Sequence, residues 1–449
     1  MCYTQGGAGK DGGKEARLFL TLATWRALLG RGALDAALAR LYGAQALPRQ
    51  RARHLMLLDR FAARFGPARE AAILSAPGRM ELCGNHTDHQ GGRVLAAAVT
   101  ADCLAVVSPS GAPGRAALAS EVYAPLTLSL ERLAPAAGER GTTAALLRGA
   151  AHCLAARGAI AGFDAALCSD VPAGAGLSSS AACAVLLGAC LTACAGRMAA
   201  PETLALAAQH AENEYFGKPS GLMDQMASAV GGLLLMDFRE PGAPRVTRLD
   251  ADFARCGLAV LLTDTGGSHA DMTQAYAAIP RDMRLAARAL GSETLGAADP
   301  AAFEAALPGL RGRVPDLALL RAMHFFDENA RVPAMAAALA AGDAARVIAL
   351  ARASGRSSFE LLQNVCPADP EERGLALALA LGERALRARG AAEDAFAVRV
   401  HGGGFAGTIQ SFVPRELANG FRADMERLFG PDSCAPAVIR PAGVTALRP

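Results

Sequence analysis

Four side chains with charged or acid–base groups lie close together in a glycine-framed segment, residues 75–92. Arg79, His86, Asp88 and His89 fall within eleven residues. A carboxylate can accept hydrogen bonds from sugar hydroxyls while an imidazole donates one, so this set favours recognition of a polyol. Two other interpretations stay open: histidines that only support the fold, and a metal site formed by His86, Asp88 and His89.

A second glycine-rich segment, residues 170–181, contains Gly174, Gly176 and three consecutive serines. Glycines let successive backbone N–H groups converge on one point, and a following helix adds partial positive charge at its N-terminus. The segment is therefore typical of a phosphate-binding loop. The alternative is an ordinary turn capped by serine. It is not a Walker A loop, because no Gly-Lys-Ser/Thr follows, and it lacks the third glycine of a dinucleotide fingerprint.

Two acidic residues twelve positions apart, Glu212 and Asp224, could divide two tasks of phosphoryl transfer. We expect Glu212 on a helix and Asp224 in a loop. One carboxylate could hold Mg²⁺ while the other orients or deprotonates an attacking hydroxyl. Taken alone, both could equally be solvated acids. A third glycine-rich segment, residues 401–407, lies between two expected strands, and by itself it also suits a tight β-turn.

The elements expected around these segments alternate between helices and strands. Apolar residues recur at three- and four-residue steps over residues 23–65, which predicts a helical region that Pro48 interrupts. Residues 77–92 are expected to form a loop. Strands are expected at 71–75, 94–107 and 162–170, and helices at 142–157, 179–195 and 201–215.

The second half also contains both strands and helices. Strands are expected at 232–238, 257–263, 395–400 and 408–413, with several helices between them. Proline and glycine concentrate between residues 237 and 253, which predicts a domain boundary there. The chain is therefore expected to have an α+β fold with a helical extension and two domains, at residues 1–60, 61–240 and 241–449.

The composition is that of a large globular protein. The 449 residues are 52% hydrophobic and 19% charged, enough for two cores. A net charge of +3 without a basic run makes nucleic acid an unexpected partner. No membrane partner is expected either, because no uninterrupted apolar stretch has the length of a span. The absence of a signal peptide and of CxxC pairs predicts a cytoplasmic protein, as a monomer or weak homo-oligomer.

Four segments, in order, resemble motifs of the GHMP small-molecule kinases and, within them, of the galactokinases. Gly-Arg-x-x-Leu-x-Gly-x-His-Thr-Asp is present at residues 78–88, and Pro-x-Gly-x-Gly-Leu-Ser-Ser-Ser-Ala at 172–181. Gly-x-Met-Asp-Gln is present at 221–225 and Gly-Gly-Gly-Phe-x-Gly at 402–407. One such loop is common in proteins, but four in the family's order are specific.

The resemblance implies a ribosomal S5 domain 2-like N-terminal domain, a ferredoxin-like C-terminal GHMP domain and an active site between them. It implies ATP-dependent phosphorylation of a hexose at its anomeric hydroxyl, with galactose as the expected substrate. Asp224 would be the catalytic base, and Arg79 would stabilise the ionising hydroxyl and the phosphoryl group. Glu212 and a serine, taken as Ser179, would bind Mg²⁺. The sugar would contact Asn85, His86, Asp88, Gly221 and Tyr276, and ATP would contact Pro172, Gly174, Gly176, Leu177, Ser178, Ser179 and Ser180.

The chain departs from the galactokinase pattern at Asn85, where the family carries glutamate. The run Asp-His-Gln-Gly-Gly that follows resembles plant galacturonokinases. Two carboxylates about 4 Å apart repel by about 4 kcal/mol at an effective dielectric near 20, and asparagine removes that repulsion for a sugar acid. Asparagine can equally bond a neutral CH₂OH group. Galactose is thus the expected substrate, galacturonate or another modified galactose the alternative, and a non-catalytic sugar and ATP sensor a further one.

Overall fold

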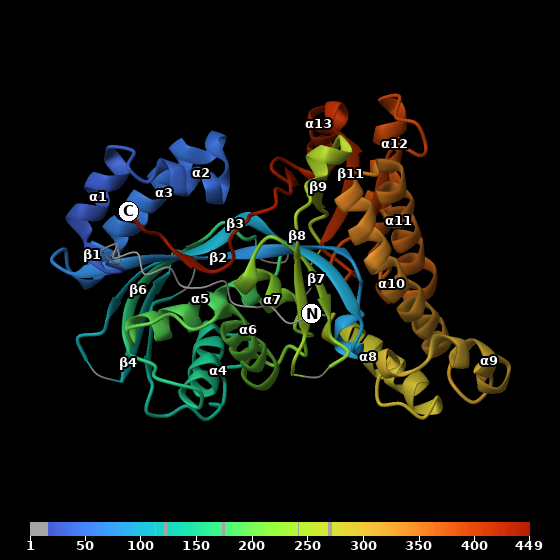
Figure 1. Cartoon of the computed structure of the whole chain (residues 1–449), viewed down its shortest axis with the longest axis horizontal. Coiled ribbons are helices and arrows are strands. Elements are labelled where there is room, and N and C mark those ends of the chain that lie inside the picture. Colours follow the sequence, from blue (N-terminus) through green and yellow to red (C-terminus); the bar gives the residue numbers. More distant parts are fainter. Residues whose placement is uncertain (1–16, 113, 121–123, 173–175, 241, 268–271) are drawn as a thin grey trace.

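The computed structural model describes residues 17–112, 114–120, 124–172, 176–240, 242–267 and 272–449 (Figure 1). Within these residues the strands form one sheet of nine strands and one of four, and helices accompany both. The predicted α+β fold is therefore confirmed. The strands of the first sheet are β1 (Leu20–Thr21), β2 (Glu70–Cys83), β3 (Arg93–Pro109), β4 (Arg115–Ser120), β5 (Leu126–Ser129), β6 (Phe163–Ser169), β7 (Leu233–Asp237), β8 (Arg245–Leu249) and β13 (Thr445–Ala446).

The long antiparallel strands β2 and β3 carry the first glycine-rich segment, residues 75–92, in β2 and in the turn between them. The pairing runs from Ala72 opposite Val107 to Cys83 opposite Leu95. The prediction of a strand that ends at residue 75 is wrong, because β2 continues through the expected loop. It does so by an irregularity between Pro77 and Arg79, which accommodates a residue that lacks a backbone donor.

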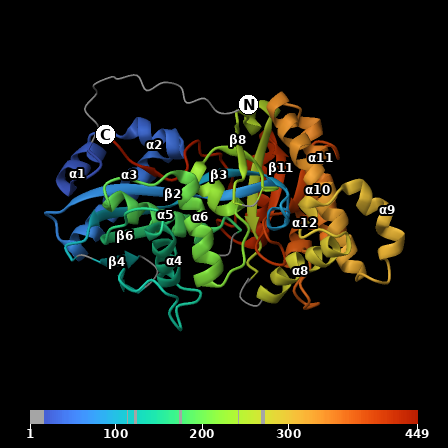
Figure 2. The ribbon, with the colours of Figure 1, turned by 60° about the horizontal axis from the view of Figure 1, so that its bottom comes forward.

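Helices cover both faces of this sheet, as Figures 1 and 2 show. On one face lie α1 (Leu22–Gly30), α2 (Asp35–Tyr42) and α3 (Leu47–Phe65), and on the other α4 (Thr143–Ala155), α5 (Ser179–Cys194), α6 (Pro201–His210) and α7 (Met223–Val230). Neighbouring residues of β2 point to opposite faces, so Ile73 packs with α1–α3 and Leu74 with α4–α7. A strand buried on both faces is rich in apolar residues, as β2 and β3 largely are, and the buried charged residues Arg79, Glu81 and Asp102 are the exceptions.

The helical extension packs on the first sheet through a buried cluster around Trp25, whose indole N–H donates to the Ala71 carbonyl at 2.7 Å. The predicted interruption at Pro48 is wrong in its position: the helical region is broken at residues 31–34 and at Gly43, and Pro48 lies in the first turn of α3, where proline is tolerated. The extension is therefore continuous with the core of the first sheet. Residues 1–16 of the expected extension lie outside the described residues.

A fully buried carboxylate, Asp102 on β3, joins the extension to the end of the chain. It accepts hydrogen bonds from Tyr42 at 2.6 Å, Arg53 at 2.6 Å and Arg440 at 3.0 Å. Burial by itself would raise the pKa of Asp102, but the two guanidinium groups outweigh it and hold the pKa below its usual value. Asp102 is therefore ionised and fixes three distant segments at one point.

Replacing Asp102 by asparagine should lower the free energy of unfolding by about 3–5 kcal/mol, because Arg440 would stay buried without its counter-charge and Arg53 would keep only its ion pair with Asp170 at 3.3 Å. Asp59→Asn is the matched control. Asp59 pairs with Arg26 at the surface, so its loss should cost at most about 1 kcal/mol. Urea unfolding of both variants measures the difference, and equal losses would contradict the assignment of a stabilising role to Asp102.

The second sheet has the strand order β10 (Ala397–Val400), β11 (Thr408–Pro414), β9 (Leu258–Asp264) and β12 (Cys434–Pro436). Its helices are α8 (Thr273–Ala289), α9 (Pro300–Leu310), α10 (Asp316–Ala341), α11 (Ala344–Ser357), α12 (Gly374–Ala388) and α13 (Ala418–Phe429). One face packs on α10, α11 and the end of the β2–β3 pair, and the other on α12 and α13. The first segment thus lies where the two sheets meet. Of the helices described, none combines the length and the apolar character needed to cross a bilayer.

The first sheet extends beyond the predicted boundary at residue 240. β8 pairs with β7, and β13 near the end of the chain pairs with β2. Gly242 and Pro244, which suggested a linker, lie between the two strands of a hairpin. The chain enters the second sheet only at β9, so the division at residue 240 does not follow the sheets.

Candidate active site

An arginine and a carboxylate from two elements meet at the centre of the candidate site. Arg79 on β2 donates from Nε to Oδ1 of Asp224 at 2.6 Å, and the Ser178 hydroxyl donates to the other oxygen. The structure therefore brings the two predicted catalytic residues together. The expectation that Asp224 lies in a loop is wrong, since α7 begins at Met223 and an acidic residue is favourable in a first helical turn.

Asp224 is ionised at neutral pH. Burial by itself would raise its pKa, but the charges of Arg79 and Lys218 and the hydrogen bond from Ser178 outweigh it, so the pKa is lower than usual. A carboxylate of low pKa is a weak base but a good hydrogen-bond acceptor. The arrangement thus suits orientation of a hydroxyl first, with the proton taken up as that hydroxyl becomes acidic.

The phosphate-binding segment is joined to the strand that carries Arg79. The Arg79 backbone N–H donates to the Leu177 carbonyl at 3.1 Å, and its guanidinium donates to the Gly176 carbonyl. No side chain fits at Gly78, where a Cβ would lie 2.8 Å from the Leu177 carbonyl oxygen. This close backbone contact fixes the position of the segment beside Arg79.

Helix α5 begins directly after this contact. Ser178 precedes it in the left-handed backbone conformation, with φ 57°, and bonds Asp224 from there. The partial positive charge of the α5 N-terminus therefore lies one hydrogen bond away from Asp224, as transfer from a phosphate to an adjacent hydroxyl requires. Pro172 is exposed at the start of the segment, and Gly174 lies outside the described residues.

Glu212 is a fully buried carboxylate in the π-helical turn Ala211–Phe216 that follows α6. Its oxygens accept hydrogen bonds from four side chains: the Ser180 hydroxyl, the Lys218 ammonium at 3.2 Å, the Gln225 amide, and the Ser220 hydroxyl at 3.3 Å. A buried carboxylate beside a phosphate-binding helix is a candidate ligand for a hard cation.

The structure places a different serine beside Glu212 from the one expected. The predicted partner of Glu212 is Ser179, but the hydroxyl that bonds Glu212 belongs to Ser180. Successive residues of a helix point about 100° apart, so only one of two adjacent serines can face this carboxylate. The sequence does not reveal which one does.

Asp88 and Gly221 form one side of the site. Asp88 accepts hydrogen bonds from the backbone N–H groups of His89 at 2.9 Å and Met223 at 3.4 Å. A Cβ on Gly221 would lie 1.8 Å from an Asp88 oxygen, so only glycine fits there. Burial, and then the negative charge of Asp224, raise the pKa of Asp88 to about 6.

Three predicted sugar-binding side chains contact the third glycine-rich segment. The Asn85 amide bonds the Gly402 carbonyl at 2.6 Å, the His86 imidazole the Gly403 carbonyl at 3.0 Å, and the Tyr276 hydroxyl the Gly404 carbonyl at 2.8 Å. Burial lowers the pKa of His86 to about 4, so its ring is neutral and donates. The other ring nitrogen of His86 bonds His89 at 3.3 Å, which uses the nitrogens that a metal between them would need.

Asn85 is completely hydrogen-bonded within the protein. Besides Gly402, its amide donates to Glu81 at 2.8 Å, and its oxygen accepts from Asn364 at 2.9 Å and Ser358 at 3.3 Å. An asparagine has two donor hydrogens and two acceptor lone pairs, and all four are taken. This differs from the expected sugar contact: Asn85 supports the third segment and keeps no group for a ligand.

The supporting residues are those that sequence reasoning missed. Asn364 and His324, which bond the Asn85 side chain and backbone, lie far from it in the chain and belong to no motif. Lys218 lies inside the segment that carries Glu212 and Asp224, yet it matches no motif position. The residue type alone could have suggested a role for Lys218, because a lysine between two carboxylates of a phosphate site is a candidate ligand of phosphate.

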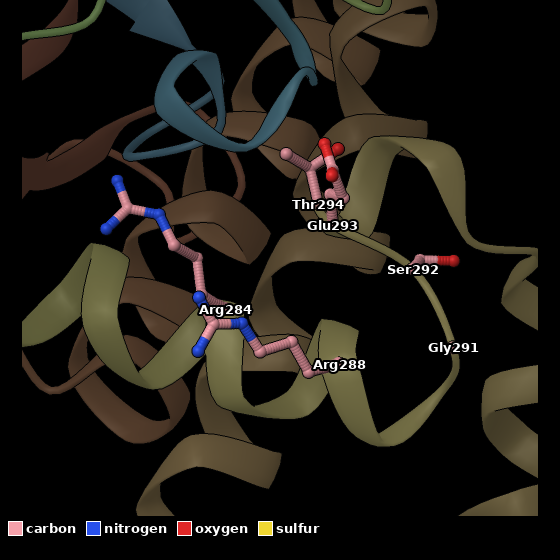
Figure 3. Close-up of a pocket in the computed structure, with 6 residues that line it drawn as sticks. All are labelled: Arg284, Arg288, Gly291, Ser292, Glu293 and Thr294. Carbon is pink, nitrogen blue, oxygen red and sulfur yellow. The ribbon is translucent and has the colours of Figure 1, made fainter.

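A separate hollow of about 490 Å³ lies at the end of α8 (Figure 3). It is lined by Arg284, Arg288, Gly291, Ser292, Glu293 and Thr294. None of the predicted site residues lines it. It adjoins the glycine-framed segment of residues 75–92 at Gly91, where a Cβ would lie 3.5 Å from the Thr294 hydroxyl. The hollow is therefore distinct from the Arg79–Asp224 centre, where the predicted catalytic residues meet.

Comparison with known proteins identifies the family of this chain. Residues 59–109 match the galactokinase galactose-binding signature, and residues 145–232 match the GHMP kinases N terminal domain. The galactokinase of Streptomyces coelicolor is 32% identical over 362 residues, which cover 78% of this chain and 86% of that protein. This chain belongs to the galactokinase family. The resemblance predicted from the four motifs is therefore confirmed.

A second relative agrees with this family, and solved structures agree with the fold. The galactokinase of Mycobacterium tuberculosis is 32% identical over 351 residues, covering 76% of this chain and 89% of that protein. The fold is similar to Lactococcus lactis galactokinase complexed with galactose, with a TM-score of 0.74, 24% identity and coverage of 86% and 98%. It is also similar to the mevalonate kinase of Methanococcus jannaschii, with a TM-score of 0.58, 12% identity and coverage of 82% and 98%. The two-domain α+β GHMP kinase fold is thus confirmed.

Proposed function

We propose that this protein transfers the γ-phosphoryl group of ATP to the anomeric hydroxyl of galactose, which yields galactose 1-phosphate and ADP. The contact of Arg79 with Asp224 beside the α5 N-terminus is the observation that supports this most strongly. The hydroxyl loses its proton, its oxygen forms a bond to phosphorus, and the bond from that phosphorus to the β–γ bridging oxygen breaks. Membership of the galactokinase family supports the sugar and the co-substrate.

The site residues divide this work between them. Asp224 orients the anomeric hydroxyl and receives its proton, and Arg79 stabilises the negative charge that develops on the sugar oxygen and the phosphoryl group. Asp88 accepts hydrogen bonds from the other sugar hydroxyls, and Gly221 leaves room for that carboxylate. The backbone around Gly176 and the α5 N-terminus bind the phosphates.

Mg²⁺ fits at Glu212 and Ser180. A carboxylate and a hydroxyl are oxygen ligands of the kind Mg²⁺ takes, usually together with phosphate oxygens. The Lys218 ammonium lies against both groups, which indicates that this corner favours positive charge. Bound there, Mg²⁺ would neutralise charge on the phosphates of ATP.

A cytoplasmic location is part of this proposal. All ten cysteines in the described part of the chain are unpaired, which agrees with a reducing compartment. A monomer or weak homo-oligomer remains the expected state, and size-exclusion chromatography tests it.

ADP release across a panel of hexoses tests the function. Galactose should give turnover that depends on sugar, whereas a sensor would bind both ligands without releasing ADP. Galacturonate is the second candidate, because no carboxylate stands at position 85 to repel a sugar acid. Turnover of galacturonate without turnover of galactose would overturn the assignment of galactose.

The affinity for galactose should depend on pH through Asp88. Its pKa is raised to about 6, so the carboxylate is ionised above pH 6 and becomes protonated as the pH falls through that value. Protonation removes a hydrogen-bond acceptor, so KM for galactose should be flat above about pH 7 and rise toward pH 5. Steady-state kinetics measure this, and Asp88→Asn should abolish the rise. A flat KM from pH 5 to 8 in the unaltered enzyme would contradict it.

A further inference from the structure

Lys218 occupies the corner between Glu212 and the phosphate-binding helix, and no motif assigns it a role. Its Nζ lies 3.2 Å from Oε1 of Glu212 and 3.2 Å from the Ser180 hydroxyl. These are the two oxygens that the proposed function gives to Mg²⁺. The side chain is 42% exposed while Glu212 is fully buried, so the ammonium reaches the carboxylate from the open side of the site.

The residue type at position 218 is unusual for this chain. Of the 45 lysines and arginines only three are lysines, namely Lys10, Lys14 and Lys218. An ammonium is a compact charge with three donors on a flexible stem, whereas a guanidinium is a larger planar fork. A lysine ammonium is small enough to fit between a carboxylate and a hydroxyl and flexible enough to leave them, and both properties favour lysine over arginine here. The one lysine after residue 14 therefore lies where these properties matter.

The charges near Lys218 indicate two positions for its ammonium. In the structure Glu212 attracts it most strongly, Asp224 attracts it further and Arg79 repels it. ATP would add several negative charges beside α5, and a divalent cation on Glu212 would repel the ammonium. The four-carbon stem allows the ammonium to move from the carboxylate to the phosphate.

We propose that Lys218 is a further phosphate-binding residue, whose ammonium exchanges Glu212 for the phosphate oxygens of ATP and leaves Glu212 and Ser180 to the divalent cation. The inference rests on the proposed function, because it takes ATP to bind beside α5. It has two consequences. The ammonium strengthens the binding of metal-free ATP, and it competes with a metal ion for Glu212 when no nucleotide is bound.

Lys218→Met tests both consequences, because methionine keeps the unbranched stem and removes the charge. Calorimetric titration with ATP in EDTA should show binding at least about tenfold weaker, the loss expected for one charge-assisted hydrogen bond. Electron paramagnetic resonance should show that Mn²⁺, without nucleotide, binds the variant more tightly than the unaltered protein. Arg140→Met is the matched control: Arg140 is an exposed cation beside Gly217, and its loss should leave both affinities unchanged.

The opposite results would overturn the proposal. If Lys218 only holds Glu212 in place, the variant binds metal-free ATP as well as the unaltered protein does, or binds Mn²⁺ more weakly. The proposed function fails in a different way: the unaltered protein would then bind no ATP or form no sugar phosphate.

A second measurement does not depend on the folding of Lys218→Met. In a Lys10→Arg, Lys14→Arg variant, Lys218 is the one remaining lysine, so reductive methylation with ¹³C-formaldehyde labels it and the N-terminal amine. The Lys218 methyl resonance should shift when ATP is added in EDTA and should not shift when galactose alone is added. An unchanged resonance on addition of ATP would overturn the proposal.

Discussion

Asp224→Asn should lower kcat by about 10²–10⁴-fold, the usual contribution of a positioned general base. The amide is almost isosteric with the carboxylate and can still accept a hydrogen bond from Arg79. It cannot take the proton of the sugar hydroxyl, and it leaves the Arg79 charge, only 6% exposed, without a counter-charge. KM for ATP should change little, because we propose that the phosphates are bound mainly by the backbone at the α5 N-terminus.

Steady-state kinetics of purified Asp224→Asn measure this effect. Ser178→Ala is a suitable control, since it removes one hydrogen bond to Asp224 and keeps the carboxylate and its contact with Arg79. That variant should lose about tenfold or less, the cost of one hydrogen bond to a charged group at the lower end of its range. Losses of equal size in both variants would indicate that Asp224 is needed only for the local structure.

Gly221→Ala should raise KM for galactose by at least about 100-fold, because displacing Asp88 removes two or more hydrogen bonds to the sugar. A Cβ at this position would lie 1.8 Å from an oxygen of Asp88 and 2.2 Å from its Cγ. The carboxylate must therefore move away from the place where we propose that it binds the sugar. KM for ATP should stay close to its normal value, since the three atoms nearest to an added Cβ at position 221 all belong to Asp88.

Gly309→Ala is the matched control for Gly221→Ala. Gly309 lies in α9, where an added Cβ meets no atom within 4 Å, so this variant should keep both KM values. Melting temperatures of both variants show whether they fold. A folded Gly221→Ala enzyme with an unchanged KM for galactose would contradict the role assigned to Asp88.

The motif residues can be found from the sequence because their types and spacing are local properties. Short segments alone predict Arg79, Asp88, Glu212 and Asp224 as site residues. In the structure Arg79 contacts Asp224, the charges of both act on Asp88, and Glu212 bonds Lys218, which Asp224 also attracts. The α+β fold class can also be predicted, since hydrophobic periodicity follows the elements. Glycine at 221 is recognised through its motif, but its physical reason, the contact with Asp88, appears only in three dimensions.

Long-range contacts explain what could not be predicted. The strand β2 continues past Pro77 because β3 pairs with it on both sides of the irregularity, and local propensity does not contain that partner. Asn85 is surrounded by groups from residues 358, 364 and 402, which no local pattern connects to it. The choice of Ser180 over Ser179 depends on the rotation of α5 relative to Glu212, which the sequence of α5 alone does not determine.

The proposed reaction requires that Arg79 and Asp224 act on the anomeric oxygen of a sugar. Nuclear magnetic resonance of the product formed from ATP and [1-¹³C]galactose tests this requirement directly, because it shows which carbon carries the phosphate. We expect a ³¹P–¹³C coupling at C1 in the product of the unaltered enzyme, and a strongly reduced rate of its formation with Asp224→Asn. A phosphate on another carbon, or a product formed equally fast by the Asp224→Asn variant, would contradict the proposed roles of both residues.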